Sequence, residues 1–521
     1  MAKPAIVFVG FMAAGKSRAA REVAGRLALE WADADELISA ELGESISAFF
    51  EREGEREFRR REEQLVVGLL DRASSGEGPQ VIALGGGAIE SAGVREALGG
   101  HLAVWCDVDE ETAWERASGS GRPLAVDRAG FSRRFAARRP LYDEVARAIL
   151  PANAKEAARV AAPWLAAMRG LRDSRMVWAQ SASGSYPAIV GAGAIGLLDA
   201  ARATLPEALP ARTFCVADVA ALAHHAGLLP DRESTIEVEG GETSKTIAEA
   251  ERVLRELAEA GARRDDCVLA LGGGVVGDLA GFCAAIYQRG VALVQAPTTL
   301  VAQVDSAYGG KTGVDLPEAK NYVGAYHMPI AVLADPATLE TLPTEEMAAG
   351  FVEVVKSALI AGGPMWDRVR GLEQLDPASL GDVIFDCART KIEVVASDER
   401  DSGRRAILNF GHTVGHAIEA ETGYGRYRHG EAVGLGLLAA LRLSEAERLR
   451  DEVAALLAAH GLPTTLDPGV AVDGVIEAVG RDKKRTSEGL GFVLLERPGE
   501  PRWGERVEPD RVRAAVEELR A

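Results

Sequence analysis

The sequence predicts an α/β protein with several domains, on three observations. A chain of 521 residues exceeds the usual size of a single domain. Apolar, strand-like segments at 6–9 and 267–271 each run into a glycine-rich loop followed by a helix-like stretch. From residue 344 onward helical periodicity dominates, with helices expected at 345–361, 384–396 and 433–459. We therefore expect an N-terminal domain with a parallel sheet, then a doubly wound α/β domain, then a mostly helical part.

The first glycine-rich loop has the spacing G-x-x-x-x-G-K-S between residues 10 and 17. In such loops backbone N–H groups surround phosphates, the lysine reaches the terminal ones and the serine hydroxyl binds Mg2+. The strand before it and the helix after it argue against a chance match. We assign to nucleotide binding the residues Gly10, Ala13, Ala14, Gly15, Lys16, Ser17 and Arg18, with Lys16 catalytic and Ser17 a magnesium ligand.

Further polar motifs follow in the first 170 residues. Asp33-Ala-Asp35 ends the second strand-like segment, and a charged helix at 54–60 carries Arg59. Three glycines, Gly85 to Gly87, close the next strand. A polar Gly/Ser-rich stretch around 121–124 is typical of a mobile lid, and the motif Arg138-Arg-Pro-Leu-Tyr142 follows. For Arg60 and Arg61 we prefer a solvated helix face paired with glutamates.

In this order the motifs resemble shikimate kinase over about residues 1 to 170. The resemblance implies transfer of phosphate from Mg-ATP to shikimate, with Arg122 as a catalytic lid arginine that reaches ATP and Asp33 serving Mg2+ through water. It implies that shikimate is held by Asp35, Arg59, Gly85, Gly86, Gly87 and Arg138. Ala13 replaces a glycine and Arg18 a threonine that are usual in this family. These departures bear on the turnover rate of the kinase more than on its identity. A gluconate-type kinase and a degenerate regulatory module remain alternatives.

A domain boundary is expected after the alanine-rich helix at 154–168, because the pattern turns polar between residues 171 and 186. The segment 181–185 reads Ser-Ala-Ser-Gly-Ser, and a new strand opens at 188–190. We expect domains at 1–172, 175–340 and 341–521.

The second glycine-rich loop, residues 272–278, favours a dinucleotide, because its backbone can approach a pyrophosphate at a helix N-terminus. The spacing is not the strict G-x-G-x-x-G, so the loop alone is a weak signal and is compatible with a simple tight turn. The cations and small polar residues that follow it indicate an anionic ligand.

A histidine-rich window indicates a metal site. His412 and His416 are four residues apart on one helix face, and His429 follows a glycine-rich loop. Upstream, Glu353 and Lys356 share a helix face. Two imidazoles and one carboxylate are a common ligand set for catalytic Zn2+, although a lone His-x-x-x-His more often packs or caps a helix.

From about residue 175 to the C-terminus these motifs resemble 3-dehydroquinate synthase. The resemblance implies a metal held by Glu353, His412 and His429. It implies NAD held by Gly240, Gly241, Glu242, Thr243, Ser244, Lys245, Gly274, Val275, Val276, Gly277, Asp278, Thr298, Thr299, Lys311 and Lys320. It implies a substrate set of Arg289, Asp305, Asn321, Lys391 and one of Lys483 and Lys484, with catalytic roles for Lys311, Lys356, Arg405, Asn409 and His416.

The implied reaction converts 3-deoxy-D-arabino-heptulosonate 7-phosphate to 3-dehydroquinate and phosphate. It uses Zn2+, with Co2+ as an alternative, and NAD that is regenerated in each turnover. The cleft between the α/β and helical parts is the expected active site. Another sugar-phosphate cyclase and a metal-dependent polyol dehydrogenase are the alternatives. The dehydrogenase is disfavoured because Lys311, Lys356 and Arg405 would have no anion to bind.

Net charge, hydropathy and cysteine content restrict the kinds of binding partner and the location that we expect. The net charge is −19, nearly all of it after residue 172, which disfavours nucleic acid. No apolar run is long enough to span a membrane, and no secretion signal is apparent. The five scattered cysteines suit a reducing cytoplasm. We expect small-molecule ligands only (shikimate, ATP and the heptulosonate phosphate), a cytoplasmic location, and a homodimer formed through the synthase part.

Overall fold

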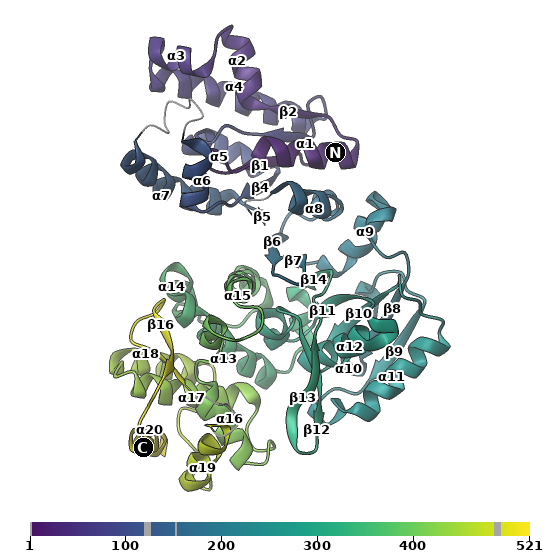
Figure 1. The fold of residues 1–521 in the computed structure, drawn as a ribbon, viewed down its shortest axis with the longest axis vertical. Coiled ribbons are helices and arrows are strands. Elements are labelled where there is room, and N and C mark those ends of the chain that lie inside the picture. Colours follow the sequence, from purple (N-terminus) through teal and green to yellow (C-terminus); the bar gives the residue numbers. More distant parts are fainter. Residues whose placement is uncertain (1–2, 119–126, 152–153, 484–490, 521) are drawn as a thin grey trace. The chain divides into compact units, whose positions relative to one another are not determined.

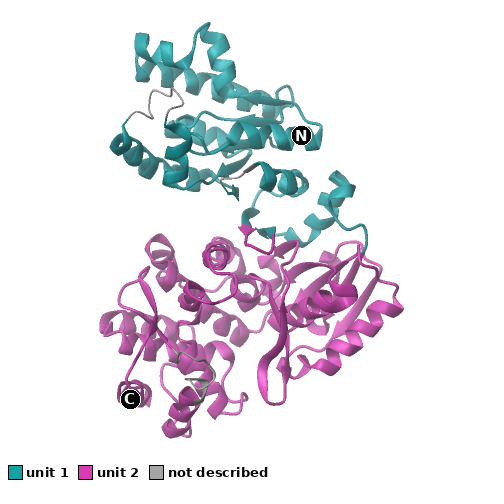
Figure 2. Cartoon of the chain, in the orientation of Figure 1, with its two compact units in different colours: residues 1–178, 185–212 teal, residues 179–184, 213–521 magenta. Residues whose placement is uncertain are grey.

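The chain forms two compact units. The computed structural model describes residues 3–118, 127–151, 154–483 and 491–520 (Figure 1). The first unit comprises residues 1–178 and 185–212, and the second comprises 179–184 and 213–521 (Figure 2). Strands and helices alternate in the first unit and in the first half of the second, so the predicted α/β class is confirmed.

The first unit is built on a largely parallel sheet. Its strands are β1 (Ile6–Val9), β2 (Trp31–Asp33), β3 (Val81–Ala83), β4 (Leu102–Cys106), β5 (Ala148–Leu150), β6 (Arg175–Gln180) and β7 (Ser185–Val190). Their order across the sheet is β2-β3-β1-β4-β5-β6-β7. β1 is central and fully buried, with parallel partners on both sides. The loop that follows β1 is therefore carried at the carboxyl edge of a rigid sheet.

The first unit also contains α-helices and short 3-10 helices. They are α1 (Lys16–Leu27), α2 (Ala34–Leu42), α3 (Ile46–Glu53), α4 (Glu55–Ser75), η1 (Ala88–Glu90), α5 (Ala92–Leu98), α6 (Glu110–Ala117), α7 (Arg128–Val145), α8 (Ala154–Met168), η2 (Ala194–Gly196), α9 (Leu197–Thr204) and η3 (Pro206–Ala208). Asp33 and Asp127 cap α2 and α7 by accepting backbone N–H groups of the first turn. These caps set where the helices near the site begin.

Part of the segment 171–186, which looks polar in the sequence, is a buried strand. Residues 175–180 form β6, because Met176, Val177 and Trp178 are buried and β6 pairs in parallel with β5. The serine-rich stretch is the turn between β6 and β7. Ser183 donates its backbone N–H to Glu399 at 2.8 Å, and its hydroxyl also bonds that carboxylate. The stretch is therefore an anchored turn.

The second unit opens with a parallel sheet. Its strands are β8 (Thr213–Asp218), β9 (Ser234–Val238), β10 (Cys267–Gly272), β11 (Ala292–Pro297) and β14 (Ala331–Ala334), ordered β14-β11-β10-β8-β9. Two helices, α11 (Ile247–Glu259) and α12 (Gly274–Ile286), contribute to one apolar core with β8, β9 and β10. An antiparallel hairpin, β12 (Lys311–Leu316) and β13 (Ala319–Tyr326), stands apart from this sheet. The doubly wound part predicted from the sequence is thus confirmed.

Beyond residue 344 the second unit is mostly helical, as predicted. The helices are α13 (Thr344–Ala361), α14 (Gly363–Arg370), α15 (Pro377–Ser397), α16 (His412–Glu421), α17 (His429–Leu443), α18 (Glu447–Ala459), α19 (Val472–Lys483) and α20 (Pro509–Glu517), with a small hairpin of β15 (Phe492–Leu495) and β16 (Pro501–Glu505). The single helix expected at 433–459 is wrong. Glu445 adopts a left-handed φ of 59° and separates α17 from α18.

Short elements complete the second unit. They are α10 (Val219–His225), η4 (Ala226–Leu228), η5 (Glu242–Ser244), η6 (Tyr287–Arg289), η7 (Ala302–Ser306), η8 (Pro336–Thr341), η9 (Arg404–Asn409) and η10 (Glu518–Arg520). η7 is a π-helical turn, a distortion that occurs often at functional sites.

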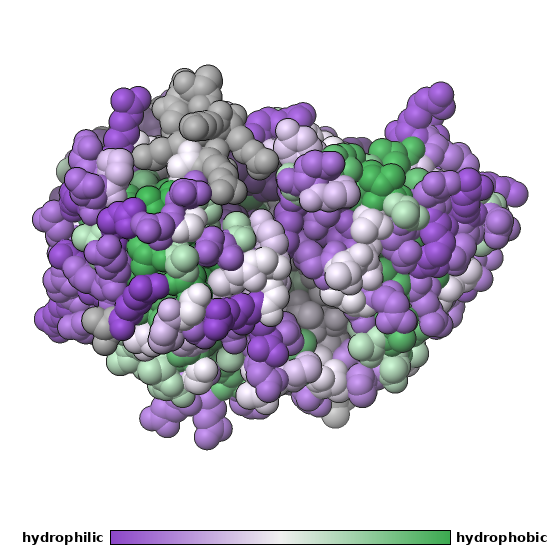
Figure 3. Space-filling model, turned by 90° about the horizontal axis from the view of Figure 1, so that it is seen from below, coloured by the Kyte–Doolittle hydropathy of each residue, from purple (hydrophilic) through white to green (hydrophobic). Residues whose placement is uncertain are grey.

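Hydrophilic side chains predominate on the face drawn in Figure 3, where apolar residues form separate groups. Among the described helices none is both long and apolar enough to cross a membrane. All five cysteines are free and buried. Burial raises the pKa of three of these thiols, Cys106, Cys215 and Cys283, to about 12.

Candidate active sites

The first site begins with the loop between β1 and α1. Gly10 and Gly15 have left-handed φ values of 143° and 90°, and a Cβ at Gly10 would lie 2.7 Å from the carbonyl oxygen of Cys106. Lys16 starts α1, is nearly buried, and donates from Nζ to the carbonyl of Phe11 at 3.1 Å. The loop is thus folded back over its lysine, beside the N-terminus of α1, an arrangement that favours an anion.

The residues predicted to hold a second substrate lie together at the glycine loop after β3. A Cβ at Gly85 would lie 2.5 Å from Oδ1 of Asp35, and one at Gly87 would lie 2.2 Å from the Arg59 guanidinium. Arg138, on α7, donates to the carbonyl of Gly86 at 3.3 Å. Three separate parts of the chain therefore meet at this loop, which has no room for larger side chains.

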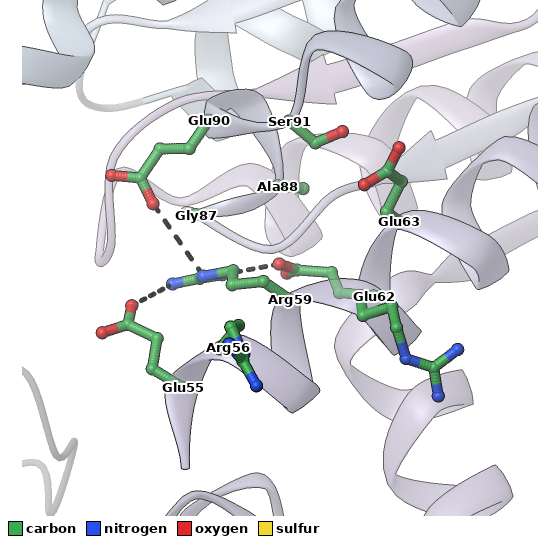
Figure 4. Close-up of a pocket in the computed structure, with 10 residues that line it drawn as sticks. Glu55, Arg56, Arg59, Glu62, Glu63, Gly87, Ala88, Glu90 and Ser91 are labelled. Carbon is green, nitrogen blue, oxygen red and sulfur yellow. Dashed lines mark hydrogen bonds and ion pairs between the residues drawn. The ribbon is translucent and has the colours of Figure 1, made fainter.

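Acidic residues surround Arg59 in the same pocket. Arg59 pairs with Glu62 at 2.5 Å and with Glu55 at 3.2 Å (Figure 4). Glu62 is buried, and this burial raises the pKa of its carboxyl, against the charge of Arg59. The sequence reading had not singled out either glutamate.

Other predicted residues of the first unit lie apart from this cluster. Asp33 is buried and its carboxylate caps α2. Arg18 is exposed and lines a separate pocket with Arg21, Glu22 and Lys155. Arg122, the proposed lid arginine, lies outside the described residues.

The second site centres on three side chains of the helical part. Glu353 lies on α13, while His412 and His429 are the first residues of α16 and α17. One potential ligand atom from each residue lies within 4.8 Å of the other two. Nε2 of His412 and Nε2 of His429 are 3.6 Å and 3.5 Å from Oε1 of Glu353. The three predicted metal ligands are thus adjacent.

The surroundings of these three residues suit a cation. His412 Nδ1 donates to the carbonyl of Phe410 at 3.2 Å, which leaves its Nε2 as a lone pair facing Glu353. Both carboxylate oxygens of Glu353 are buried; Oε2 pairs with the Lys356 ammonium, while Oε1 faces the two histidine Nε2 atoms. A bound metal ion would satisfy Oε1.

The charges at this centre favour an ionised carboxylate. Burial alone would raise the pKa of Glu353, but Lys356 and the imidazoles hold it well below its usual value. Burial lowers the pKa of His412 to about 3, so its imidazole is neutral. Burial also disfavours the charged form of His429, but Glu353 and Glu419 outweigh it and raise that pKa to about 10. A metal must therefore displace a proton from His429.

A charged network extends from the metal ligands. Lys356 pairs with Glu353 and lies 3.6 Å from Asp305, which sits on the π-turn η7. Lys391, on α15, lies 2.8 Å from the same Asp305 oxygen. Burial would raise the pKa of Asp305, but the two ammonium groups lower it to about 2. The network thus holds two buried cations around a single carboxylate.

Arg405 is held by a tight loop. Asp398 accepts the backbone N–H groups of Gly403 and Arg405 at 2.8 Å and 3.0 Å. The buried guanidinium of Arg405 donates to the carbonyls of Glu399 at 2.6 Å and Gly309 at 3.4 Å. Asn409, at the end of η9, is exposed.

The turn from β10 into α12 has the geometry expected for a pyrophosphate site. A Cβ at Gly273 or at Gly274 would each lie 3.0 Å from a side-chain atom, of Thr299 and Ser306 respectively. The glycines therefore leave the backbone accessible at the N-terminus of a 13-residue helix. Thr298 donates its N–H to the carbonyl of Gly272 at 2.9 Å, which fixes the neighbouring loop.

The predicted NAD lysines are distributed around this turn. Lys245 pairs with Asp278 at 2.6 Å and also bonds the side chain of Asn321. Lys320 lies 3.7 Å from Glu242. Lys311, half-exposed at the start of β12, has a different partner, an acidic residue of the 398–405 loop at 2.6 Å.

Four further predicted residues belong to the second unit. Arg289 is exposed on η6 with a left-handed φ of 68°. Lys483 is the last residue of α19 and its side chain is not described, while Lys484 lies outside the described residues. The His416 ring centroid is 5.2 Å from that of His412.

Glu419 is a functional candidate that the sequence reading missed. Its buried carboxylate lies 3.4 Å from Nδ1 of His429 and accepts from it. Glu419 is also within reach of His416, so these two residues and His429 form a second group with metal-ligand geometry. Its position seven residues after His412, on the same helix face, was a signal available in the sequence.

Together the two units define an enzyme with two candidate sites, in a phosphate-loop domain joined to an α/β domain with a candidate metal centre. The profile of the shikimate kinase family matches residues 12–169. The profiles "3-dehydroquinate synthase N-terminal" and "3-dehydroquinate synthase C-terminal" match residues 235–349 and 350–485.

Two curated relatives are 3-dehydroquinate synthases. That of Symbiobacterium thermophilum is 44% identical over 354 residues, which is 64% of this chain and 98% of the relative. That of Halorhodospira halophila is 44% identical over 341 residues, 63% of this chain and 94% of the relative. The chain belongs to the 3-dehydroquinate synthase family, and its first part carries a shikimate kinase domain. It is a bifunctional enzyme of the shikimate pathway.

Solved structures of related cyclases share the fold of the second unit. A 2-deoxy-scyllo-inosose synthase, complexed with carbaglucose-6-phosphate, NAD+ and Co2+, is 25% identical with a TM-score of 0.57, covering 66% of this chain and 99% of that one. A 2-epi-5-epi-valiolone synthase from Streptomyces hygroscopicus, with NAD+ and Zn2+ bound, is 26% identical with a TM-score of 0.55, covering 60% and 92%.

Proposed function

We propose that the first site phosphorylates shikimate with Lys16, Arg59 and Arg138 as its principal cations. The observation that carries this proposal is the gathering of Arg59 and Arg138 at the tightly packed glycine loop, next to the phosphate loop that holds Lys16. A planar guanidinium matches a carboxylate, and shikimate has one. Lys16 would then stabilise the negative charge on the phosphoryl group as it passes from ATP to the acceptor hydroxyl.

Mg2+ would be held with ATP by Ser17 directly and by Asp33 through water. A coupled assay of ADP release, run with shikimate, with gluconate and with no acceptor, tests the first site. Release that requires shikimate supports the proposal. Equal ADP release with gluconate would show that shikimate is not the specific acceptor of the first site.

We propose that the second site converts 3-deoxy-D-arabino-heptulosonate 7-phosphate to 3-dehydroquinate and phosphate. Glu353, His412 and His429 would hold Zn2+ or Co2+, a role supported by the convergence of both imidazole Nε2 atoms on Oε1 of Glu353. The turn into α12 would hold the NAD pyrophosphate. When bound, the metal and NAD supply a Lewis acid at the substrate hydroxyl and a reversible hydride acceptor, so no net redox change results.

The residues of the second unit would orient this substrate. Lys356, Lys391 and Arg405 are buried cations that can bind its phosphate and carboxylate. Asp305 holds the two lysines together and, with Glu353, balances their charge before substrate arrives. A local cationic pocket is needed because the chain as a whole carries a charge of −19.

The test of the second site compares the heptulosonate phosphate with a sugar phosphate that lacks a carboxylate. We expect phosphate release only from the first, without accumulation of reduced nicotinamide. The identity of 44% to 3-dehydroquinate synthases, against 25% to an inosose synthase, supports this choice of substrate. If the enzyme turned over only the sugar phosphate without a carboxylate, the site would belong to another cyclase.

We further propose that the enzyme is a cytoplasmic homodimer formed through its synthase part. The five buried free thiols support a reducing compartment. The exposed Arg289 is the residue proposed to reach into the neighbouring site. Light scattering of the full chain tests the oligomeric state.

A further inference from the structure

Glu90 occupies the carboxylate-binding face of Arg138. Glu90 ends η1, three residues after the last glycine of the 85–87 loop. Arg138 donates from Nε to Oε1 of Glu90 at 3.0 Å and from Nη2 to Oε2 at 3.1 Å. These two parallel hydrogen bonds are the geometry in which arginine binds any carboxylate.

The same carboxylate also faces Arg59, which lines the neighbouring pocket together with Glu90. Nε of Arg59 lies 3.8 Å from Oε2 of Glu90. Figure 4 shows the Glu90 side chain pointing toward Arg59 across a pocket of about 460 Å³. Glu90 thus faces both of the cations that the proposed function assigns to shikimate.

Exposure distinguishes Glu90 from the other acidic partner of Arg59. The Glu90 side chain is 41% exposed, whereas that of Glu62 is 6% exposed and that of Arg138 is 2% exposed. Glu62 is fixed in the interior. Glu90 can rotate into water, where its charge is solvated, and leave the buried Arg138 to another carboxylate.

We propose that Glu90 is an internal competitor for the substrate carboxylate and thereby a specificity-determining residue. This inference rests on the proposed roles of Arg59 and Arg138 in binding shikimate. While the site is empty, Glu90 satisfies the buried guanidinium of Arg138, which would otherwise carry a desolvation penalty. A ligand carboxylate displaces Glu90 and takes over the same two hydrogen bonds.

Displacement makes the site selective. A ligand with a carboxylate replaces one ion pair by another, so its remaining contacts set its affinity. A ligand of the same shape without a carboxylate leaves Glu90 in place and gains nothing from Arg138. An acidic residue in an anion pocket therefore lowers affinity for the substrate and raises discrimination against uncharged analogues.

The experiment compares Glu90→Gln with Glu63→Gln in the full chain. Glu63 lines the same pocket, and the structure records no ion pair between it and Arg59 or Arg138 among the described residues. Both substitutions remove one negative charge from the pocket, so the second measures the general charge effect alone. Shikimate affinity is measured by calorimetry without ATP, and kcat and KM by ADP release.

For Glu90→Gln we expect shikimate to bind roughly two- to fivefold more tightly than the wild type, because a partly exposed ion pair is of modest strength. Its KM should fall in parallel while kcat changes little. Glu63→Gln should show a smaller gain, and Glu90→Ala is the second variant should glutamine impair folding. Structural damage would weaken binding, so a gain in affinity separates competition from a supporting role.

Unchanged or weaker shikimate binding in both Glu90 variants would overturn the inference. So would an equal gain in Glu63→Gln, since a general charge effect would then explain the result. Failure of the proposed function looks different, because the wild-type chain itself would not phosphorylate shikimate.

Discussion

Glu353 and Lys356, one helical turn apart on α13, form an ion pair in which each side chain is 1% exposed. The pair explains how a carboxylate can remain ionised in the interior before a metal arrives. Lys356 supplies the compensating charge, and its own pKa is raised, because Asp305 and Glu353 outweigh the effect of burial. The charge of Glu353 is therefore compensated in the absence of a metal ion, and we expect the second unit to stay folded when metal is removed.

Metal removal should abolish cyclisation and leave NAD in place. None of the three proposed metal ligands belongs to the turn into α12 that we assign to NAD. His412→Ala should have the same effect as chelation. Phosphate release from the heptulosonate phosphate and retention of NAD are measured before and after chelation. An undiminished rate in a metal-free sample would contradict the assignment.

Glu419→Gln should lower the affinity for Zn2+ about tenfold or more, because a carboxylate that accepts from a metal-bound imidazole fixes its orientation and tautomer. Glu421→Gln is the matched control, since Glu421 is exposed on the same helix. Zn2+ affinity is measured by competition with a chromophoric chelator. Equal affinities in the two variants would show that His429 is oriented without Glu419.

Lys16→Ala should reduce the rate of phosphate transfer to shikimate by orders of magnitude. The ammonium is fixed against the phosphate loop, where it can stabilise charge that develops in the transition state. Cyclisation in the same protein serves as the control and should be unchanged. A modest loss of kinase kcat would indicate that another cation contacts the transferring phosphate.

Arg138→Ala should chiefly raise the KM for shikimate, with ATP binding little changed. Arg138 contacts the glycine loop at Gly86 and no residue of the phosphate loop other than the ring of Phe11 in the described contacts. Separate titrations with ATP and with shikimate check this. Lost ATP affinity with retained shikimate affinity would reverse the role given to Arg138.

The two activities should be separable near residue 173. Fragments 1–172 and 175–521 should each keep near-native kcat/KM. Fragment 1–172 should unfold more easily than fragment 1–212, because β5 loses its pairing with β6. Fragment 213–521 should not cyclise: a relative that matches 64% of this chain extends into the residues before Thr213. Cyclisation by fragment 213–521 would contradict the last of these expectations. If fragment 1–172 or 175–521 were inactive until the other was added, the two activities would not be separable.

Much of both sites was predictable because their residues share a local periodicity or a fixed spacing. The loop 10–17 and the pairs His412/His416 and Glu353/Lys356 are local patterns, and the structure places each on the expected loop or helix face. The substrate and cofactor roles themselves remain predictions. The contact between Glu90 and Arg138 had no local signal, since it depends on how α7 packs 48 residues further along the chain.

Errors arose where burial overrode local composition. Residues 175–180 lie in a stretch that reads as polar, yet they form β6, because an adjacent strand offers backbone partners to Met176 and Val177. The break between α17 and α18 depends on a left-handed φ at Glu445. Residues other than glycine rarely adopt this conformation, so the sequence does not signal the break.

The buried free thiols make the opening of each unit separately observable. Cys106 belongs to the first unit, and the other four cysteines belong to the second. Since thiolates are the reactive form, thiols with a raised pKa and no access to water resist alkylation until their surroundings open. The time course of alkylation, followed peptide by peptide, would therefore record local unfolding of the kinase part and the synthase part in one undivided sample, using only the native cysteines.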